Sequence, residues 1–513
     1  MKRTVIFVHI LLLCCLFTGI SRSLYAQAGL DRIIYLAKER GTVYSMLERV
    51  SEKSGYLFIY DSKVVDNAHS VKLKEGSRSI REAVYEIIGN QRALLRLVGG
   101  HILICEQTEQ AMIAEVPTST GYFTLQGRLL DKYSGVPIAY GTVGVAGNTI
   151  GTITNQNGDF RLRLHDSLSR SIIRIFHLGY VAQDIDVSLL VGGPTVLSLE
   201  PRVIEIPGVI VRVSNPIKVL RQMLDNRDVN YAQEPVYLTT FYREGVQYKQ
   251  QFQNLSEAVF KVYKAPLSNN MVGDQVKLLK KSLIANKGMR DTLMAKISAG
   301  IDACLQLDFM KQLPDFLIPD ESSDYPYVYT SGKSTTIGDR LVNVVCFEQK
   351  NGIEYPLYKG ELYIDDQNGA LLQANIEIHP QFINKAVDML VVRQARILKT
   401  IPQKVTYTVT YKPWNGKYYI NHIRGDLFFK VKKRHQWLGS SSLHAWFEMV
   451  TCRIETQNVI RFQRNERLPT RTVFSETHFK DDPNFWGEFN VIPWEQELSK
   501  IIHEISARVE KLF

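Results

Sequence analysis

The chain contains little cysteine, which argues against a fold held together by disulfides. Only 6 of its 513 residues are cysteine, and two of these lie within the first 27 residues. The other four, Cys105, Cys304, Cys346 and Cys452, are too few and too scattered for a disulfide scaffold. They are interpreted as small buried hydrophobic residues, and their pairing is left open.

Local motifs for catalysis or metal binding are also missing. No two histidines lie within four residues of each other, so the usual spacing of metal ligands is absent. Asp365 and Asp366 are interpreted as turn residues rather than calcium ligands. We therefore predict no cofactor, no metal and no enzymatic activity. A hydrolytic site assembled from distant residues such as His379, His422 and His444 remains an alternative.

Long hydrophobic runs are absent beyond the N-terminus. Residues 5–17 are almost entirely apolar, follow Lys2 and Arg3, and precede the small residue Ala26. This pattern predicts a secretory signal peptide over residues 1–27. A retained anchor is the alternative, although the run is shorter than the about 20 residues that span a bilayer. No transmembrane helix is predicted after cleavage, and an exported protein does not ordinarily meet nucleic acid.

The positive charge is concentrated in one part of the chain. Without residues 1–27, 59 basic residues stand against 52 acidic ones, whereas residues 385–434 alone hold 12 basic and 2 acidic residues. Within this stretch Lys430, Lys432, Lys433 and Arg434 form the densest group. We predict that they contact phosphate-bearing lipid headgroups or an acidic partner. The alternative is a solvated sheet face whose outward positions are basic.

Residues 28–108 show the pattern of a small α/β domain. One helix is expected to start after Thr42 and stop at Gly55, and a second is expected to start at the capping residue Ser79 and end before Gly89. Strands are expected at 33–36, 57–60, 71–73, 94–97 and 102–105, with a glycine turn at 99–100. The segments "VYSMLERVSEKSGYLFIYDS", "VKLKEGSRSIREAVYEIIG" and "LLRLVGGHILIC" resemble the secretin and TonB-receptor N-terminal domain. That resemblance implies a periplasmic module for protein contact and signalling.

A linker at 109–121 precedes a segment with almost only β-strand character. Residues 122–213 show about seven short strands, and Asn157-Gly158 predicts a tight hairpin turn, so a β-sandwich is expected. The segments "LQGRLLDKYSGVPIAYGTVGVAGNTIGTITNQNGDFRL" and "IIRIFHLGYV" resemble the carboxypeptidase regulatory-like domain, a transthyretin-like sandwich. The resemblance implies a structural module without the catalytic groups of a peptidase.

Residues 214–513 predict a large, curved antiparallel sheet with a few helices. Long alternating segments are joined at Asn368-Gly369 and Asn415-Gly416, which are strong hairpin signals. The last residues, from Pro493 onward, have the spacing of an amphipathic helix. The chain as a whole is therefore expected to be a multidomain α+β, mainly β protein.

The order of these modules suggests a function. The two N-terminal modules in this order resemble the periplasmic front end of outer-membrane receptors of the Bacteroidota type. The about 300 residues that follow them are too few for the plug domain and the membrane barrel of such a receptor. The leading hypothesis is a non-catalytic contact or scaffold protein of the periplasm, bound to an outer-membrane or periplasmic partner. The alternative makes the C-terminal domain a carrier or sensor of a lipid or amphiphile, because "GELYIDDQNGALLQA" resembles the open half-barrels of lipoprotein carriers.

Overall fold

The computed structural model describes residues 30–495 with a number of gaps. The predicted signal peptide, most of the predicted linker and the predicted C-terminal helix lie outside the described residues. No helix in the described part is long and apolar enough to cross a membrane. The gaps are 62–64, 68, 92, 99–100, 107–120, 203–214, 250, 269–272, 286–295, 298–299, 321, 323, 338–339, 394–397, 435–438, 471–473 and 475–488.

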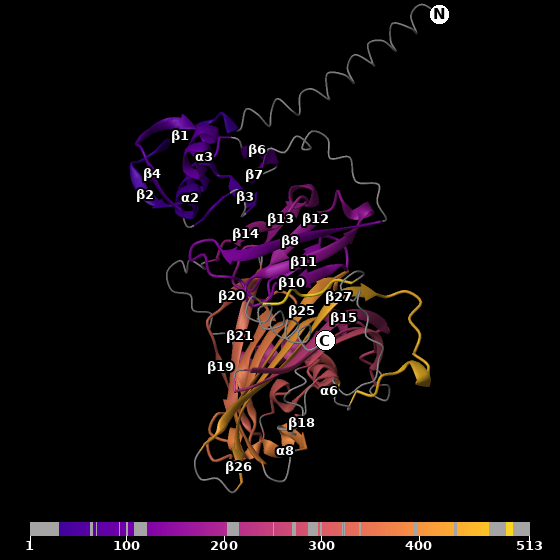
Figure 1. The fold of residues 1–513 in the computed structure, drawn as a ribbon. Coiled ribbons are helices and arrows are strands. Elements are labelled where there is room, and N and C mark those ends of the chain that lie inside the picture. Colours follow the sequence, from indigo (N-terminus) through magenta and orange to yellow (C-terminus); the bar gives the residue numbers. More distant parts are fainter. Residues whose placement is uncertain are drawn as a thin grey trace, which may run out of the picture. The chain divides into compact units, whose positions relative to one another are not determined.

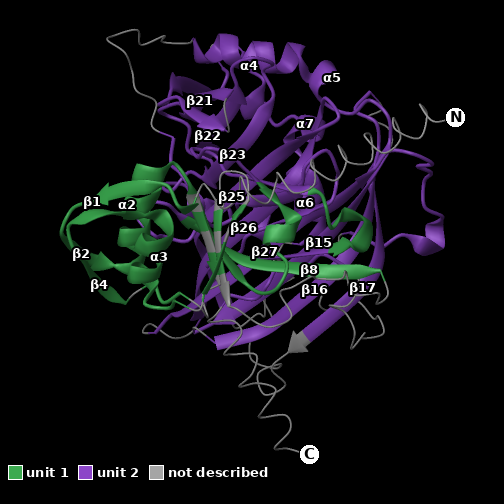
Figure 2. Ribbon diagram, turned by 90° about the horizontal axis from the view of Figure 1, so that it is seen from above, with its two compact units in different colours: residues 1–130, 164–171, 185–198 green, residues 131–163, 172–184, 199–513 purple. Residues whose placement is uncertain are grey.

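The chain divides into two compact units. Unit 1 comprises residues 1–130, 164–171 and 185–198, and unit 2 comprises residues 131–163, 172–184 and 199–513 (Figure 2). The residues expected to form the β-sandwich, 122–213, therefore contribute to both units.

The two predicted helices of unit 1 are present and end at the predicted glycines, Gly55 and Gly89. In α2 (Val43–Ser54), the Thr42 side chain accepts a hydrogen bond from the backbone of Ser45. In α3 (Ile80–Ile88), Ser79 and Glu82 form the expected capping box. Their buried faces pack together in one hydrophobic cluster, because apolar residues recur every three or four positions.

Most strands of unit 1 are short, and they form two two-stranded sheets and part of a six-stranded sheet. β1 pairs with β5, β2 pairs with β4, and β3 lies parallel to β7 and antiparallel to β14. The strands predicted in residues 28–108 are all present. The strands that lie wholly or mostly in unit 1, including β2 and β5, which were not predicted, are β1 (Ile33–Leu36), β2 (Glu39–Thr42), β3 (Leu57–Asp61), β4 (Ser70–Leu73), β5 (Gly76–Ser79), β6 (Ala93–Val98), β7 (His101–Glu106), β8 (Tyr122–Asp131) and β14 (Thr195–Leu199).

The prediction of a hairpin at Asn157-Gly158 is wrong. Strands β10 and β11 flank this turn but belong to different sheets. Gly158 has the positive φ of a turn residue, 77°. The Asn155 side chain accepts hydrogen bonds from the backbone of Asn157 and Asp159, and the turn leads the chain from one sheet to another. The strands of this region are β9 (Thr142–Val145), β10 (Gly151–Ile153), β11 (Asp159–His165), β12 (Ile172–Phe176) and β13 (Gln183–Asp186).

Unit 2 contains the predicted large antiparallel sheet, which has 11 strands (Figure 1). Ten follow the order β17-β16-β15-β27-β26-β25-β23-β22-β21-β19, and β20 pairs with β21. Their bounds are β15 (Val236–Tyr248), β16 (Gln251–Lys264), β17 (Gln275–Ala285), β19 (Tyr327–Ser331), β20 (Thr335–Ile337), β21 (Arg340–Gln349), β22 (Tyr358–Asp365), β23 (Leu371–Ile378), β25 (Leu398–Trp414), β26 (Lys417–Lys433) and β27 (Ser441–Glu455). A separate pair is formed by β18 (Lys296–Ile297) and β24 (Val391–Arg393).

Both hairpins predicted within this sheet are confirmed. Asn368 and Gly369 connect β22 to β23, and Asn415 and Gly416 connect β25 to β26. Asn415 and Gly416 both have positive φ, 48° and 73°, as a two-residue hairpin turn requires. Asp365 accepts hydrogen bonds from the backbone of the first turn, in agreement with its interpretation as a turn residue.

One face of the large sheet is packed against helices. Buried side chains of the helices, such as Leu220, Phe309 and Met310, share one hydrophobic cluster with Leu362 and Val409 of the sheet. This face is therefore filled by the protein itself. The helices are α4 (Pro216–Asp225), α5 (Arg227–Asn230), α6 (Ile301–Gln306), α7 (Phe309–Gln312) and α8 (Val387–Leu390).

Candidate functional site

A row of polar residues crosses the large sheet on the face opposite the helices. Side chains alternate between the two faces of a strand, so the pairing register decides which residues become neighbours. The first half of the row joins five strands: Thr330 on β19, Cys346 on β21, Glu361 on β22, Asn375 on β23 and Thr408 on β25. Among the residues that the structure describes, no helix covers these strands on this face.

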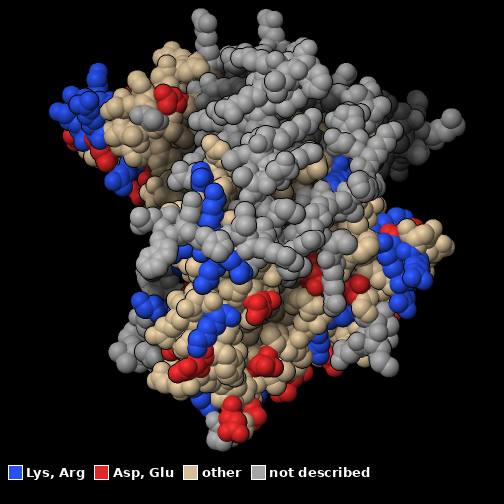
Figure 3. Space-filling view, turned by 60° about the horizontal axis from the view of Figure 1, so that its bottom comes forward, with Lys and Arg blue, Asp and Glu red and all other residues tan. Residues whose placement is uncertain are grey.

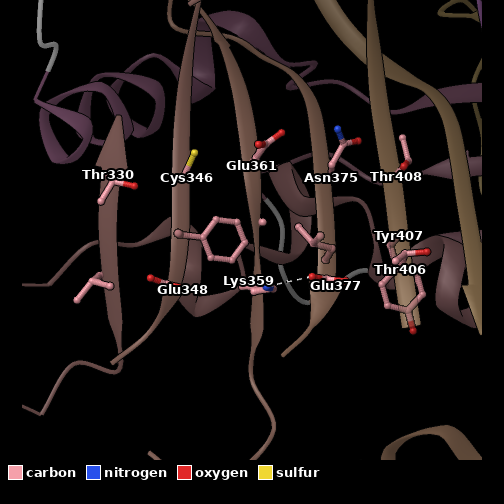
Figure 4. A pocket seen from close by; sticks show the side chains of 14 residues that line it. Thr330, Cys346, Glu348, Lys359, Glu361, Asn375, Glu377, Thr406, Tyr407 and Thr408 are labelled. Carbon is pink, nitrogen blue, oxygen red and sulfur yellow. Dashed lines mark ion pairs between the residues drawn. The ribbon is translucent and has the colours of Figure 1, made fainter. Parts of the chain in front are cut away.

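This first half of the row forms an open groove with a volume of about 540 Å³. Figure 4 shows Cys346, Glu361 and Asn375 side by side, with Thr330 and Thr408 at the two ends of the row. The groove is lined by Val328, Thr330, Cys346, Phe347, Glu348, Lys359, Gly360, Glu361, Asn375, Ile376, Glu377, Thr406, Tyr407 and Thr408.

The groove offers hydrogen-bonding groups and a surplus of negative charge. Lys359 forms an ion pair with Glu377 at 3.2 Å, which leaves Glu348 and Glu361 as the other carboxylates of the lining. The Tyr363 hydroxyl donates to Glu361 at 2.6 Å and holds its carboxylate in place. Carboxylate, hydroxyl and amide oxygens accept hydrogen bonds, so the groove suits ligands that bear hydroxyl or amino groups.

Gly360 allows the two central strands of the groove to approach closely. A Cβ atom at this position would lie 2.1 Å from the backbone oxygen of Asn375 and 2.9 Å from the Cα atom of Ile376. Every other residue type carries that atom, so only glycine fits without separating β22 from β23.

The second half of the row is buried and charged. It continues from Thr408 through Arg424, Glu448, Arg243 and Glu257 on β26, β27, β15 and β16. This ionic row could not be predicted from the sequence, because the register that joins these strands is not visible in any one segment. Charged residues inside apolar strand segments, as in "TTFYREG" and "HAWFEMV", were the only signal for it.

Arg243 lies at the centre of the ionic row and is completely buried. Its Nε donates to Glu257 Oε1 at 2.7 Å, Nη1 donates to Glu448 Oε1 at 3.3 Å, and Nη2 donates to the Ile492 carbonyl oxygen. Trp494 also donates to Glu257. The segment around Ile492 thus covers the row, and its carbonyl oxygen accepts a hydrogen bond from the buried guanidinium group.

Arg424 and Asp426 form the end of the ionic row next to the groove. Both Arg424 Nε and Nη2 donate to Asp426 at 2.9 Å, and the guanidinium lies over the Trp446 ring at 4.4 Å. His444 Nε2 lies 2.9 Å from the same carboxylate. Burial opposes ionisation of Asp426, but the contacts with His444 and Arg424 outweigh it and lower the pKa of Asp426.

His422 is buried in this row without a hydrogen bond. Its ring stacks on Tyr140 with a centroid distance of 4.7 Å, and its Nε2 lies 3.8 Å from Glu448 Oε2, beyond hydrogen-bonding distance. Burial lowers the pKa of His422, although the nearby Glu448 carboxylate acts in the opposite direction. The neutral imidazole is therefore the favoured form in the folded protein.

The low pKa of His422 predicts a loss of stability in acid. Below about pH 6.5 the unfolded chain binds a proton at this histidine more readily than the folded chain, so unfolding is favoured as the pH falls. His422→Phe keeps an aromatic ring against Tyr140 and removes the titration. We expect its unfolding free energy to fall less steeply than that of the wild type between about pH 7 and pH 5. The matched change His379→Phe, at a partly exposed site, should leave the pH dependence of the unfolding free energy as it is in the wild type. The same pH dependence in all three proteins would contradict the prediction.

The structure places the predicted anion-contact residues at one end of β26. Lys430, Lys432, Lys433 and Arg434 are all exposed, whereas Phe429 before them and Val431 between Lys430 and Lys432 are buried. On the face shown in Figure 3, basic and acidic side chains are interspersed, so this view shows no continuous field of one sign.

The histidines and cysteines considered in the sequence analysis do not converge on one site. His422 and His444 lie beside the ionic row, near Glu448 and Asp426, whereas His379 packs on Phe382 beyond the end of β23. Cys304 and Cys452 are buried free thiols, and Cys346 is a partly exposed free thiol in the groove. In the described residues, no group of three or more His, Cys, Asp or Glu is placed to hold a metal ion.

Comparison with known proteins gives no family assignment. No family model and no curated protein matches the chain. A domain assigned as an outer membrane lipoprotein-sorting protein from Vibrio parahaemolyticus is 11% identical over 49% of this chain and 96% of that chain, with a TM-score of 0.22. A DUF1329 family protein from Desulfovibrio piger is 10% identical over 48% of this chain and 95% of that chain, with a TM-score of 0.20. Lipovitellin is 9% identical over 47% of this chain and 27% of that chain, with a TM-score of 0.20. TM-scores of this size do not establish a common fold.

Proposed function

We propose that the protein is an exported envelope protein whose large sheet binds an amphiphile, with the polar head of the ligand in the groove. The observation that carries the proposal is the open groove on the sheet face opposite the helices. Its volume of about 540 Å³ lies within the range of small-molecule sites, which is about 300–1,000 Å³. In this proposal the protein holds its ligand and carries out no reaction on it.

The lining favours a head that bears hydroxyl or amino groups. Glu348 and Glu361 attract a cationic group, and Asn375, Thr406 and Thr408 can hydrogen-bond to hydroxyl groups. This differs from the apolar groove expected from the resemblance to half-barrel carriers. The difference arises because the protein's own helices fill the apolar face of the sheet, whereas the groove lies on the polar face.

The groove offers a small apolar contact to the hydrocarbon chain of the ligand. Val328 lies in the lining and is 39% exposed, whereas Phe347, Ile376 and Tyr407 border the groove but are buried in the cluster on the helix side of the sheet. An exposed apolar residue beside the polar groups suits a ligand with a polar head and an adjoining apolar chain.

A role in protein contact is a second candidate, favoured by an apolar surface on unit 1. Ile33 and Tyr35 are alternate residues of β1 and therefore point to the same side, and their exposed fractions are 69% and 54%. Exposed apolar residues that adjoin one another often mark an interaction site. We propose that this strand contributes to contact with an outer-membrane or periplasmic protein.

The accessibility of Cys346 tests the groove proposal. In a Cys105→Ser background, Cys346 is the partly exposed cysteine of the described residues, whereas Cys304 and Cys452 are buried. We expect dodecylamine, a long-chain amine, to slow the labelling of Cys346 by a thiol reagent at least about threefold. Butylamine, which has the same head and a short chain, serves as the control and should have little effect. Equal protection by both amines, or by neither, would contradict the proposal.

A further inference from the structure

The far end of the long β25–β26 hairpin carries a group of exposed basic side chains, which we call the basic end. The register places Lys399 opposite Lys432 and Lys404 opposite Phe428. The members are all exposed in the structure: Lys399, Lys404, Lys430, Lys432, Lys433 and Arg434.

The basic end has no acidic counterpart among the described residues. None of its six cations forms an ion pair there, although Arg434 Nε donates to the Leu398 carbonyl oxygen at 3.3 Å. The nearest acidic residue along β26 is Asp426, and its carboxylate already contacts Arg424 and His444. Repulsion between the cations is therefore not relieved inside the described molecule, and an external anion would relieve it.

An aromatic side chain is exposed on the same side of β26 as the lysines. Phe428, Lys430 and Lys432 are alternate residues of the strand, and the exposed fraction of Phe428 is 39%. Its ring stacks on His444 at a centroid distance of 4.2 Å with an interplanar angle of 5°, which fixes its orientation. A phenyl ring flanked by ammonium groups combines the two contacts that a bilayer surface offers, apolar chains and phosphate groups.

We propose that the basic end docks the protein on the surface of an anionic lipid bilayer. Clusters of four to eight Lys or Arg residues are typical of binding to anionic lipids, and the cluster has six members. Exposed Phe428 favours a bilayer over an acidic protein, because it gives the charged patch an apolar contact at the headgroup level. The inference goes beyond the ligand groove and does not depend on it, since the two surfaces share no residue.

Vesicle flotation with the full chain tests this proposal. Vesicles of three parts phosphatidylcholine to one part phosphatidylglycerol should bind the protein, and phosphatidylcholine alone should not. Lys430→Glu/Lys432→Glu should weaken binding at least about tenfold, and salt at about 0.5 M should weaken binding of the wild type. The control Arg461→Glu/Arg464→Glu changes the net charge equally at two exposed residues outside the basic end and should bind as the wild type does. Equal binding by both double variants, whether strong or weak, would overturn the proposal.

A second variant distinguishes binding to a bilayer from binding to an acidic protein. Phe428→Ser removes the apolar contact and keeps all six cations, so it should weaken binding to the vesicles while binding to soluble polyglutamate stays unchanged. If the variant binds vesicles as well as the wild type does, the contact is purely ionic and the bilayer proposal is wrong. The fluorescence-detected unfolding midpoint of each variant establishes that it is folded, and a groove without ligand affects none of these outcomes.

Discussion

Replacing Arg243 with leucine is expected to destabilise unit 2 by about 3–5 kcal/mol near neutral pH. The change leaves the buried carboxylates of Glu257 and Glu448 without the guanidinium that lies 2.7 Å and 3.3 Å from them. Removing one partner of a buried ion pair costs more than the pair itself contributes, because the remaining charge stays out of water. The loss should become smaller as the pH falls, since the unpaired carboxylates can then bind protons.

Urea unfolding followed by tryptophan fluorescence measures this effect in unit 2. All five tryptophans lie between residues 414 and 494, so their emission reports on this unit. The control is Arg174→Leu, which removes an ion pair with Asp184 between side chains that are 56% and 43% exposed. An exposed pair contributes about 0–1 kcal/mol. If Arg243→Leu shifted the unfolding free energy no more than this control, the ionic row would not stabilise the sheet.

Replacing Gly360 with alanine should destabilise the same unit by about 2–3 kcal/mol, because the added methyl group overpacks the contact between β22 and β23. The new Cβ would lie 2.1 Å from the backbone oxygen of Asn375, and backbone cannot move aside as a flexible side chain can. The two strands would have to separate, and the groove that they line would change shape.

Gly273→Ala is the matched control for this prediction. A Cβ at position 273 meets no atom within 4 Å, so the substitution should change the unfolding free energy by no more than about 0.5 kcal/mol. The fluorescence-detected urea transition again provides the measurement. Similar midpoints for Gly360→Ala and the wild type would show that the strands tolerate a wider spacing at this point.

Elements governed by local chemistry could be predicted from the sequence. The caps at Thr42 and Ser79 mark the starts of both helices of unit 1, and Asn368-Gly369 and Asn415-Gly416 mark two hairpins of the large sheet. In each case a few adjacent residues determine the backbone conformation. The turn at Asn157-Gly158 shows the limit of this reasoning, because the same dipeptide there joins strands of different sheets. A turn sequence indicates a change of direction and does not determine which strands pair.

The candidate site depends on information that no single segment contains. Thr330 and Thr408 lie 78 positions apart in the sequence, and four pairings of strands must be known before they can be placed in one row. The ionic row requires the pairing of β15 with β27, whose residues Arg243 and Glu448 are 205 positions apart. The basic group at 430–434 could be predicted because its four members lie within five consecutive positions of the sequence.

Native mass spectrometry of three gently purified proteins tests the central claim most directly. The wild type should carry a bound amphiphile. Asn375→Trp places a large side chain in the middle of the groove and should abolish this adduct. The control Asn351→Trp makes the same replacement at an exposed turn outside the groove and should keep the adduct. An adduct that persists in Asn375→Trp, or a wild-type protein with none, would contradict the proposal that the groove binds an amphiphile.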